Sequence, residues 1–198
     1  LTLNFNGGII NEAEEYQNTF GYGTEIPLSS AAPVKSGYTL VGWAEDPNAT
    51  PDQKDYAIDG TFSLTEDTVL YAVWQENTFT VTYHANNGEN KTVTQTVGVV
   101  TGDTIYSQEK SGFAWEHKDF LGWSTNQYAT AADANYEAGK AVPVIQLDGT
   151  TVLKGKNYDL YAVWAEHLYT ITIKSNFDTE AEDDVQYIGN YIPKALTN

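Results

Sequence analysis

Carboxylates are the side chains of this sequence best suited to do chemistry. The 198 residues include 27 Asp and Glu against 10 basic residues, which gives a formal net charge of −17. Two carboxylates on either side of a glycosidic bond can hydrolyse it, so a glycosidase-like pair is the first catalytic hypothesis. The chain itself provides a test, because a required carboxylate should recur wherever the sequence repeats.

The sequence contains one pattern twice. Three motifs recur in the same order: Lys-Ser-Gly with Tyr or Phe at 35–38 and 110–113, Gly-Trp at 42–43 and 122–123, and Leu-Tyr-Ala-Val-Trp at 70–74 and 160–164. A third marker, Gly-x-x-Ile, occurs three times, at 23–26, 102–105 and 189–192. Identical runs that include Trp and Tyr indicate a tandem duplication.

The carboxylates of the first copy are not repeated in the second. The aligned pairs are Glu45 with Thr125, Asp46 with Asn126, Asp55 with Asn135, and Asp67 with Asn157. Glycine, tryptophan, tyrosine and aliphatic residues are what the copies share, and these specify a fold and not a reaction. We therefore expect no catalytic residues and no enzymatic activity.

Metal and cofactor sites are not expected either. His84, His117 and His167 lack the close spacing of metal ligands and a serine partner motif. The acidic run at 178–184 lacks the central glycine and the final bidentate glutamate of a helix-loop-helix calcium site. A solvated charged loop is the better interpretation of that run.

The aromatic residues carry the remaining ligand-binding hypothesis. Four tryptophans lie at matched positions and are expected in the core or between repeats: Trp43, Trp74, Trp123 and Trp164. Aligning the Lys-Ser-Gly motifs leaves five extra residues in the second copy, at 114–118, and Trp115 lies among them. An exposed Trp there could stack on a sugar or dock a protein, or fold back as a local staple. Trp115, Tyr128 and Tyr136 are the candidate ligand-binding residues.

Composition excludes several partners. All basic residues are lysines, and the strong negative charge opposes binding to nucleic acid or to an anionic membrane surface. The sequence contains no run of 18 apolar residues, the length that a segment needs to span a bilayer. Cysteine is absent, so neither a disulfide framework nor a thiolate site is expected.

Each copy is predicted to be rich in strands. Alternating apolar and polar residues at 1–5, 79–83 and 169–173 indicate half-buried strands, and the first of these enters the pattern one or two residues late. Short helical turns are expected at 27–33 and 107–110. Asp148-Gly149 between apolar runs predicts an extra hairpin near 142–153 in the second copy.

Boundaries follow from the repeats. Residues 1–76 form the first repeat module, 77–165 a longer second module, and 166–198 the first half of a third. A segment as short as this half repeat cannot bury an adequate core of its own. It should therefore either dock on the second module or complete a sheet with another chain, which would be self-association.

The motifs resemble the Listeria–Bacteroides repeat, the internalin B-repeat family of bacterial surface proteins. The resemblance rests on Gly37-Tyr38, Gly42-Trp43 and the Leu-Tyr-Ala-Val-Trp run at 70–74, with Phe113 in place of the tyrosine in the second copy. It implies a β-rich α+β fold of tandem, small β-grasp-like modules, each a mixed sheet with one short helix. It also implies an extracellular, cell-surface location and structural or adhesive roles, with no catalytic residues.

Two functional hypotheses follow. The first is a structural or adhesive segment, a stalk or interaction module, of a bacterial surface or secreted protein, with a protein or glycan partner at the cell exterior. The alternative is a carbohydrate-binding module that uses the exposed aromatic residues of the second copy. The sequence begins in a strand-like run without an initiating methionine or signal peptide, as expected for a fragment.

Overall fold

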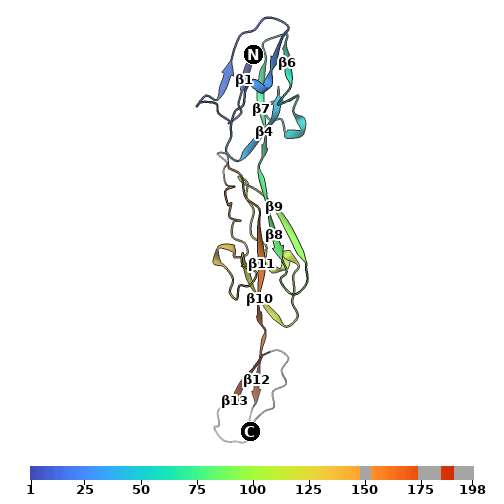
Figure 1. The fold of residues 1–198 in the computed structure, drawn as a ribbon, viewed down its shortest axis with the longest axis vertical. Helices are drawn as coiled ribbons and strands as arrows, with labels where there is room; N and C mark the ends of the chain where they lie inside the picture. Colours follow the sequence, from blue (N-terminus) through green and yellow to red (C-terminus); the bar gives the residue numbers. More distant parts are fainter. Residues whose placement is uncertain (148–152, 174–183, 190–198) are drawn as a thin grey trace. The chain divides into compact units, whose positions relative to one another are not determined.

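The computed structural model describes residues 1–147, 153–173 and 184–189 of the chain. Its regular structure is mainly short strands, and helix is confined to single turns (Figure 1). The expectation of a β-rich chain with mixed sheets and little helix is confirmed. Strands in the first repeat are β1 Thr2–Asn4, β2 Glu15–Gln17, β3 Thr24–Pro27, β4 Tyr38–Ala44, β5 Tyr56–Ala57, β6 Thr61–Leu64 and β7 Val69–Glu76.

The first repeat is a five-stranded mixed sheet with a smaller antiparallel pair beside it. The sheet has the order β2-β1-β7-β4-β5, and β3 pairs with β6. Strand β1 runs parallel to β7, with Leu3 opposite Leu70, whereas the other pairs in this sheet are antiparallel. Parallel pairing joins the start of the repeat to its end.

The second repeat uses the same parallel pairing. Its strands are β8 Thr78–His84, β9 Thr92–Gly98, β10 Lys118–Ser124 and β11 Tyr158–Glu166, in the order β10-β11-β8-β9. Strand β8 runs parallel to β11, with Tyr83 opposite Leu160. Because Leu70 and Leu160 are the same position of the repeated motif, Leu3 and Tyr83 are equivalent. Leu1 therefore corresponds to Val81, and the alternating pattern at 1–5 starts two residues later in the repeat than the pattern at 79–83.

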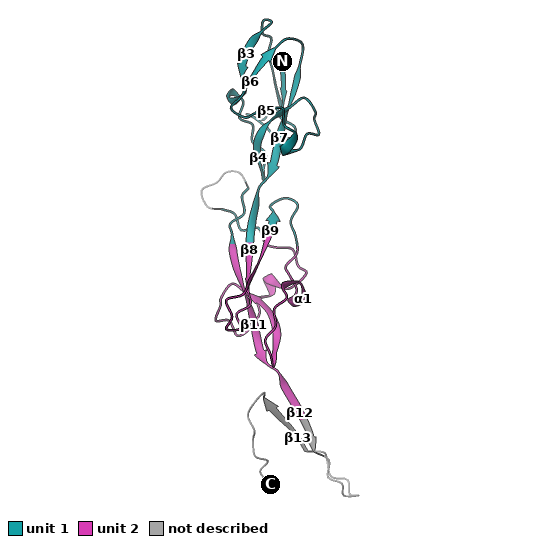
Figure 2. Cartoon of the chain, turned by 90° about the vertical axis from the view of Figure 1, so that its right-hand side faces the viewer, with its two compact units in different colours: residues 1–80, 96–103, 144–157 teal, residues 81–95, 104–143, 158–198 magenta. Residues whose placement is uncertain are grey.

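Compact units in the chain do not follow the repeats. Residues 1–80, 96–103 and 144–157 form one unit, and residues 81–95, 104–143 and 158–198 form the other (Figure 2). The first unit thus contains the first repeat together with two segments of the second. The boundaries expected from the sequence near 76 and 165 stay a prediction.

The Gly-Trp motif is a β-bulge that turns a tryptophan into the core. The register between β4 and β7 shifts at Gly42, and that between β10 and β11 shifts at Gly122. Their φ angles are 159° and 133°, and a Cβ at Gly42 would collide with the carbonyl oxygen of Tyr56. The following residues, Trp43 and Trp123, are fully buried.

The Leu-Tyr-Ala-Val-Trp strands close each repeat. Leu70, Ala72, Leu160 and Ala162 are fully buried on one face of these strands, and Val73 and Val163 are buried on the other. At the end of the motif, Trp74 Nε1 donates to the carbonyl of Phe5 at 3.0 Å, and Trp164 Nε1 donates to that of Ala85 at 2.8 Å. Each bond ties the end of a repeat back to its first strand.

The two expected helical turns are present. The first is the 3-10 helix η1, Leu28–Ser30, which follows Pro27. The second is α1, Gln108–Ser111, where the Ser107 hydroxyl caps the helix by accepting from Lys110 N at 3.1 Å. Gly112 ends this helix with a φ of 66°. Further 3-10 turns are η2 Pro51–Gln53 and η3 Ala134–Tyr136.

The five-residue insertion expected at 114–118 is wrong. Strands β4 and β10 have equal lengths, and the residue before each accepts the same bond: Asn77 N donates to Gly37 O at 2.8 Å and His167 N to His117 O at 3.1 Å. The counterpart of Gly37 is therefore His117, which also has a positive φ of 60°. Gly112 instead terminates α1, so the repeated Lys-Ser-Gly letters serve different structures.

The extra residues of the second copy lie earlier, in the helical turn. Leu28 N donates to Gly60 O at 3.0 Å, and Ile105 N donates to Lys140 O at 2.8 Å, which makes Leu28 and Ile105 equivalent. Ile26 and Ile105, paired through the Gly-x-x-Ile marker, are thus not equivalent. The second repeat builds a full α-turn where the first has a 3-10 turn, and that consumes the added residues.

Two predicted features fall partly outside the described residues. The Asp148-Gly149 turn is one, although its flanks pair: Leu147 N donates to Lys154 O at 2.7 Å and Lys156 N to Ile145 O at 2.6 Å. The half repeat is the other. Its strands β12, Leu168–Ile173, and β13, Asp184–Gly189, form an antiparallel pair, and the acidic run at 178–183 and the end of the third Gly-x-x-Ile marker are not described.

The indole N–H groups of the two buried tryptophans should contribute differently to the free energy of unfolding. Trp123 Nε1 donates to Tyr106 O at 2.7 Å, whereas Trp43 Nε1 has no partner among the described residues. Truncation to alanine should cost about 3–5 kcal/mol at either site. Phenylalanine should cost about 1 kcal/mol more at Trp123 than at Trp43, because only there is a hydrogen bond lost. Urea unfolding of Trp43→Phe and Trp123→Phe measures this, and equal losses would contradict it.

Candidate functional site

Trp115 lines a polar hollow in the second repeat. The hollow has a volume of about 630 Å³ and is lined by Asn87, Glu89, Ala114, Trp115, Glu116, His117, Lys118 and Glu166. Trp115 is 38% exposed and packs edge-on against Trp164, with ring centroids 6.1 Å apart. The indole is therefore anchored by the repeated tryptophan while part of it stays accessible, which combines the two alternatives left open by the sequence.

The first repeat has different side chains at the positions that border this hollow. There, Lys35 takes the place of Trp115: its ammonium lies 4.8 Å from the Tyr38 ring centroid and 5.8 Å from that of Trp74. In the second repeat, Lys118 takes the place of Tyr38 and lies 5.1 Å from the Trp115 ring. The lysine and the aromatic residue have exchanged positions between the repeats. Both repeats therefore keep a cation–π contact, but the aromatic ring lies at position 38 in the first and at position 115 in the second.

The structure does not bring the three candidate aromatic residues together. Tyr128 is 81% exposed and Tyr136 packs against Tyr158 at a centroid distance of 5.8 Å, and neither lines the hollow beside Trp115. Burial, with a smaller contribution from Asp133, raises the pKa of Tyr136. Burial also raises the pKa of Tyr158, whose hydroxyl donates to Pro143 O at 3.2 Å. These two tyrosines therefore form a structural pair.

The histidines pair with carboxylates. His84 Nε2 lies 2.8 Å from Asp159 Oδ1 and its ring stacks on Tyr161, while His167 Nδ1 lies 2.8 Å from Asp119 Oδ1. Within the described part of the chain, no group of three or more histidine and acidic side chains is arranged to hold a metal ion.

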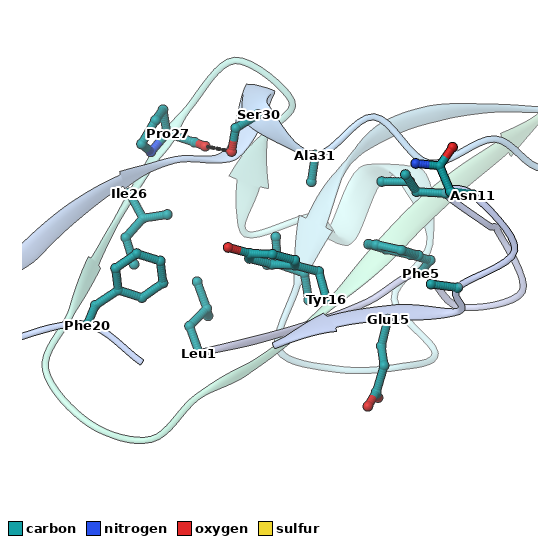
Figure 3. A pocket seen from close by; sticks show the side chains of 13 residues that line it. Leu1, Phe5, Asn11, Glu15, Tyr16, Phe20, Ile26, Pro27, Ser30 and Ala31 are labelled. Carbon is teal, nitrogen blue, oxygen red and sulfur yellow. Dashed lines mark hydrogen bonds between the residues drawn. The ribbon is translucent and has the colours of Figure 1, made fainter. Parts of the chain in front are cut away.

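A second hollow, of about 610 Å³, lies in the first repeat. Its walls are mostly apolar: Leu1, Leu3, Phe5, Ile10, Asn11, Ala13, Glu15, Tyr16, Phe20, Ile26, Pro27, Ser30 and Ala31. Figure 3 shows Leu1, Phe20 and Ile26 on one side of it and Phe5 on the other, with Pro27 and Ser30 along a third edge. No sequence pattern indicated this site, because its residues are ordinary core types that come from separate strands and turns.

A carboxylate joins the first repeat to the second. Glu76, the last residue of β7, accepts hydrogen bonds from the backbone N–H groups of Val100 and Thr101 at 2.8 and 2.7 Å and from the Thr101 hydroxyl at 3.1 Å. Desolvation acts to raise the pKa of Glu76, but the hydrogen bonds from Thr101 and Val100 prevail and lower it. All of these residues belong to the first compact unit.

Asn77 completes this inter-repeat joint. Its N–H donates to Gly37 O, its Oδ1 accepts from the Thr39 hydroxyl at 2.6 Å, and its Nδ2 donates to Leu153 O at 3.0 Å. Gly37 has a φ of 81°, and a Cβ there would collide with the Val100 side chain. Other side chains stand at the equivalent positions of the second repeat: Asp119 Oδ1 lies 2.8 Å from His167 Nδ1, and Lys118 forms a salt bridge with Glu166.

The fold and the joint define a class of protein built from consecutive, similarly closed β-rich repeats. Comparison with protein families agrees: the model of the Listeria-Bacteroides repeat domain matches residues 1–73 and 79–144. The chain belongs to this family. The resemblance drawn from the Gly-Trp and Leu-Tyr-Ala-Val-Trp motifs is thereby confirmed.

Two curated relatives come from Evansella cellulosilytica. One, named "Putative membrane protein", is 28% identical over 179 residues, covering 89% of this chain and 22% of the relative. The other, named "Putative Gly-rich membrane protein", is 28% identical over 165 residues, covering 82% of this chain and 17% of the relative. The chain thus spans about a fifth of the length of these relatives. No solved structure matches it.

Among residues 1–147, 153–173 and 184–189, none of the helices is both long and apolar enough to cross a bilayer.

The Glu76 bonds should make stability depend on pH in a defined window. Because the pKa of Glu76 is lowered on folding, its contribution is present above the unfolded value, about 4.3, and is lost as the pH falls through the folded value. Glu76→Gln should lower the thermal midpoint at pH 7, and its difference from the unchanged chain should shrink as the pH falls from about 5 to 3.

The matched control for this measurement is Glu66→Gln, which also removes one negative charge from the first repeat. No hydrogen bond to the Glu66 carboxylate contributes to the joint, so this variant should leave the midpoint at pH 7 nearly unchanged. A midpoint for Glu76→Gln equal to that of Glu66→Gln at every pH would contradict the role of the carboxylate.

Proposed function

We propose that this chain is a structural repeat segment of a bacterial cell-surface protein, a stalk or interaction region without catalytic activity. The inter-repeat joint around Glu76 and Asn77 is the observation that carries the proposal. A connection that fixes the turn after β9 of one repeat on the last strand of the preceding one suits a segment that holds other parts at a defined spacing.

Family membership and the relatives' names support this assignment. Both relatives are named as membrane proteins, and this chain corresponds to a limited part of each. We propose an extracellular location for the segment, tandem β-grasp-like modules as its architecture, and a protein or glycan at the cell exterior as its partner. The residues that the repeats share are buried Leu, Ala and Trp and the bulge glycines, which supports a structural role over a catalytic one.

Epitope accessibility on intact cells tests the spacer role. In the full-length protein, an epitope inserted directly before residue 1 should bind antibody on intact cells. Deletion of residues 1–165 should shield it, and an unrelated repeat array of the same length should restore binding. An epitope reached only after the cells are lysed would contradict the surface assignment. Accessibility that is unchanged by the deletion would contradict the spacer role.

The hollow beside Trp115 favours carbohydrate binding as a second candidate function. A partly exposed indole, held by Trp164 and bordered by Asn87, Glu89 and Lys118, offers a sugar both a stacking face and hydrogen-bonding groups. The first repeat lacks such a face because Lys35 occupies that position.

A glycan array tests this candidate function. Saturable binding to a glycan should be lost in Trp115→Ala and retained in Tyr128→Ala, a matched control that removes a far more exposed aromatic ring outside the hollow. Absence of binding to any glycan, or equal loss in both variants, would overturn the carbohydrate function and leave the structural role in place.

A further inference from the structure

The apolar hollow of the first repeat is open where the second repeat is filled by aromatic rings. Tyr83, fully buried, stacks on Tyr106 with centroids 4.9 Å apart and an angle of 3° between the planes. Its hydroxyl donates to Gln95 Oε1 at 2.6 Å and accepts from Tyr106 N at 3.2 Å. The second repeat thus buries the ring of Tyr83, covers it with the half-buried ring of Tyr106, and satisfies the Tyr83 hydroxyl.

The first repeat lacks both rings at the equivalent positions. Leu3 stands where the second repeat has Tyr83, as the parallel strand pairing shows, and Leu3 lines the hollow. After Leu28, the counterpart of Ile105, the chain continues with Ser29 and not with a tyrosine. The shorter turn η1 contributes only Ser30 to the wall. The cavity therefore lies at the place where an aromatic ring would complete the packing.

Polar groups at the edge of the hollow match a phenol. The Ser30 hydroxyl donates to Pro27 O at 2.7 Å, which leaves its oxygen free to accept from a ligand hydroxyl. Asn11 and Tyr16 add further hydrogen-bonding atoms to the lining. A mostly apolar cavity of about 610 Å³ with a few polar groups has the size and composition of a ligand-binding pocket.

The charge beside the hollow selects among aromatic ligands. Glu15 lines the hollow, and its carboxylate points away from the cavity (Figure 3). Glu12 and Glu14 are neighbours in the sequence of the lining residues Asn11, Ala13 and Glu15, and all three glutamates are exposed. No lysine lines the hollow, and the whole chain carries a net charge of −17. A ligand that inserts a ring here would gain from positive charges on either side of that ring.

We propose that the hollow of the first repeat binds a tyrosine side chain presented by a polypeptide in which basic residues flank the tyrosine. The ring takes the place that Tyr83 and Tyr106 fill in the second repeat, and the flanking basic residues lie against Glu12, Glu14 and Glu15. This site is separate from the hollow beside Trp115 and does not depend on the spacer role.

Titration of the full chain with two synthetic peptides tests the proposal. The probes are Lys-Lys-Tyr-Lys-Lys and Lys-Lys-Ala-Lys-Lys, each with blocked termini, and binding is followed by amide chemical shifts. The tyrosine peptide should bind saturably, shift the amides of Leu3, Ile26 and Ala31, and bind at least about tenfold more tightly than the alanine peptide. Binding should weaken with added salt and in Glu15→Lys.

Variants that fill the cavity locate the site. Leu3→Tyr copies the second repeat and should abolish binding of the tyrosine peptide. Ser30→Tyr should fill the hollow from its edge. It replaces Leu3→Tyr in the experiment if the Leu3→Tyr variant does not fold. Leu121→Tyr, the same change as Leu3→Tyr at an exposed position of the second repeat, should bind as the unchanged chain does.

Three results would overturn the proposal. The first is an affinity for the tyrosine peptide no greater than for the alanine peptide or for a leucine peptide of the same charge. The second is undiminished binding in both cavity-filling variants. The third is a set of shifted amides centred on Trp115 and not on Leu3.

Discussion

Each repeat depends on the parallel pairing of its first strand with its last. This pairing closes a loop of about 70 residues or more, an entropic cost that local turns alone would not offset. Buried Leu70 and Leu160 lie at its centre, and an indole N–H bonds the first strand at its end, over sequence separations of 69 residues for Trp74 and 79 for Trp164. Asn6 and Asn86 add equivalent bonds to Ala72 O and Ala162 O.

The joint between repeats is a consequence of this closure. Glu76 and Asn77 lie two and three residues after Trp74, at the end of β7 and just past it, so their positions are fixed by the pairing of this strand. From there Glu76 bonds the turn after β9, and Asn77 bonds the residue that precedes β4. The second repeat keeps this layout with different chemistry, since His117, Asp119 and His167 replace Gly37, Thr39 and Asn77. The backbone bond at Asn77 is therefore shared by His167, while the side chains around it are not.

Sequence reasoning found the features that both copies repeat. The duplication, the alternating strands and the buried Trp43 and Trp123 follow from patterns visible within a few residues. The alignment was wrong where the same three residues occur in different structures. Lys-Ser-Gly ends a helix at 110–112 but precedes a strand at 35–37, so aligning the two runs shifts the register. In the structure Trp115 is the counterpart of Lys35 and not part of an insertion. The partners of Glu76 and the hollow beside Leu3 could not be predicted, because both depend on residues that only the folded chain brings together.

We propose binding functions only where the copies differ, because the residues that the copies share pack the interior of each repeat. Trp115 occurs only in the second repeat, and the hollow beside Leu3 lies in the first. The joint between the repeats sets the spacing that we propose for this segment, and amide hydrogen exchange measures the strength of that joint most directly. The N–H groups of Val100 and Thr101, bonded to Glu76, should exchange slowly in the full chain and faster in Glu76→Gln. Exchange of both amides at the rate of an unstructured peptide in the unchanged chain would contradict a fixed connection between the repeats.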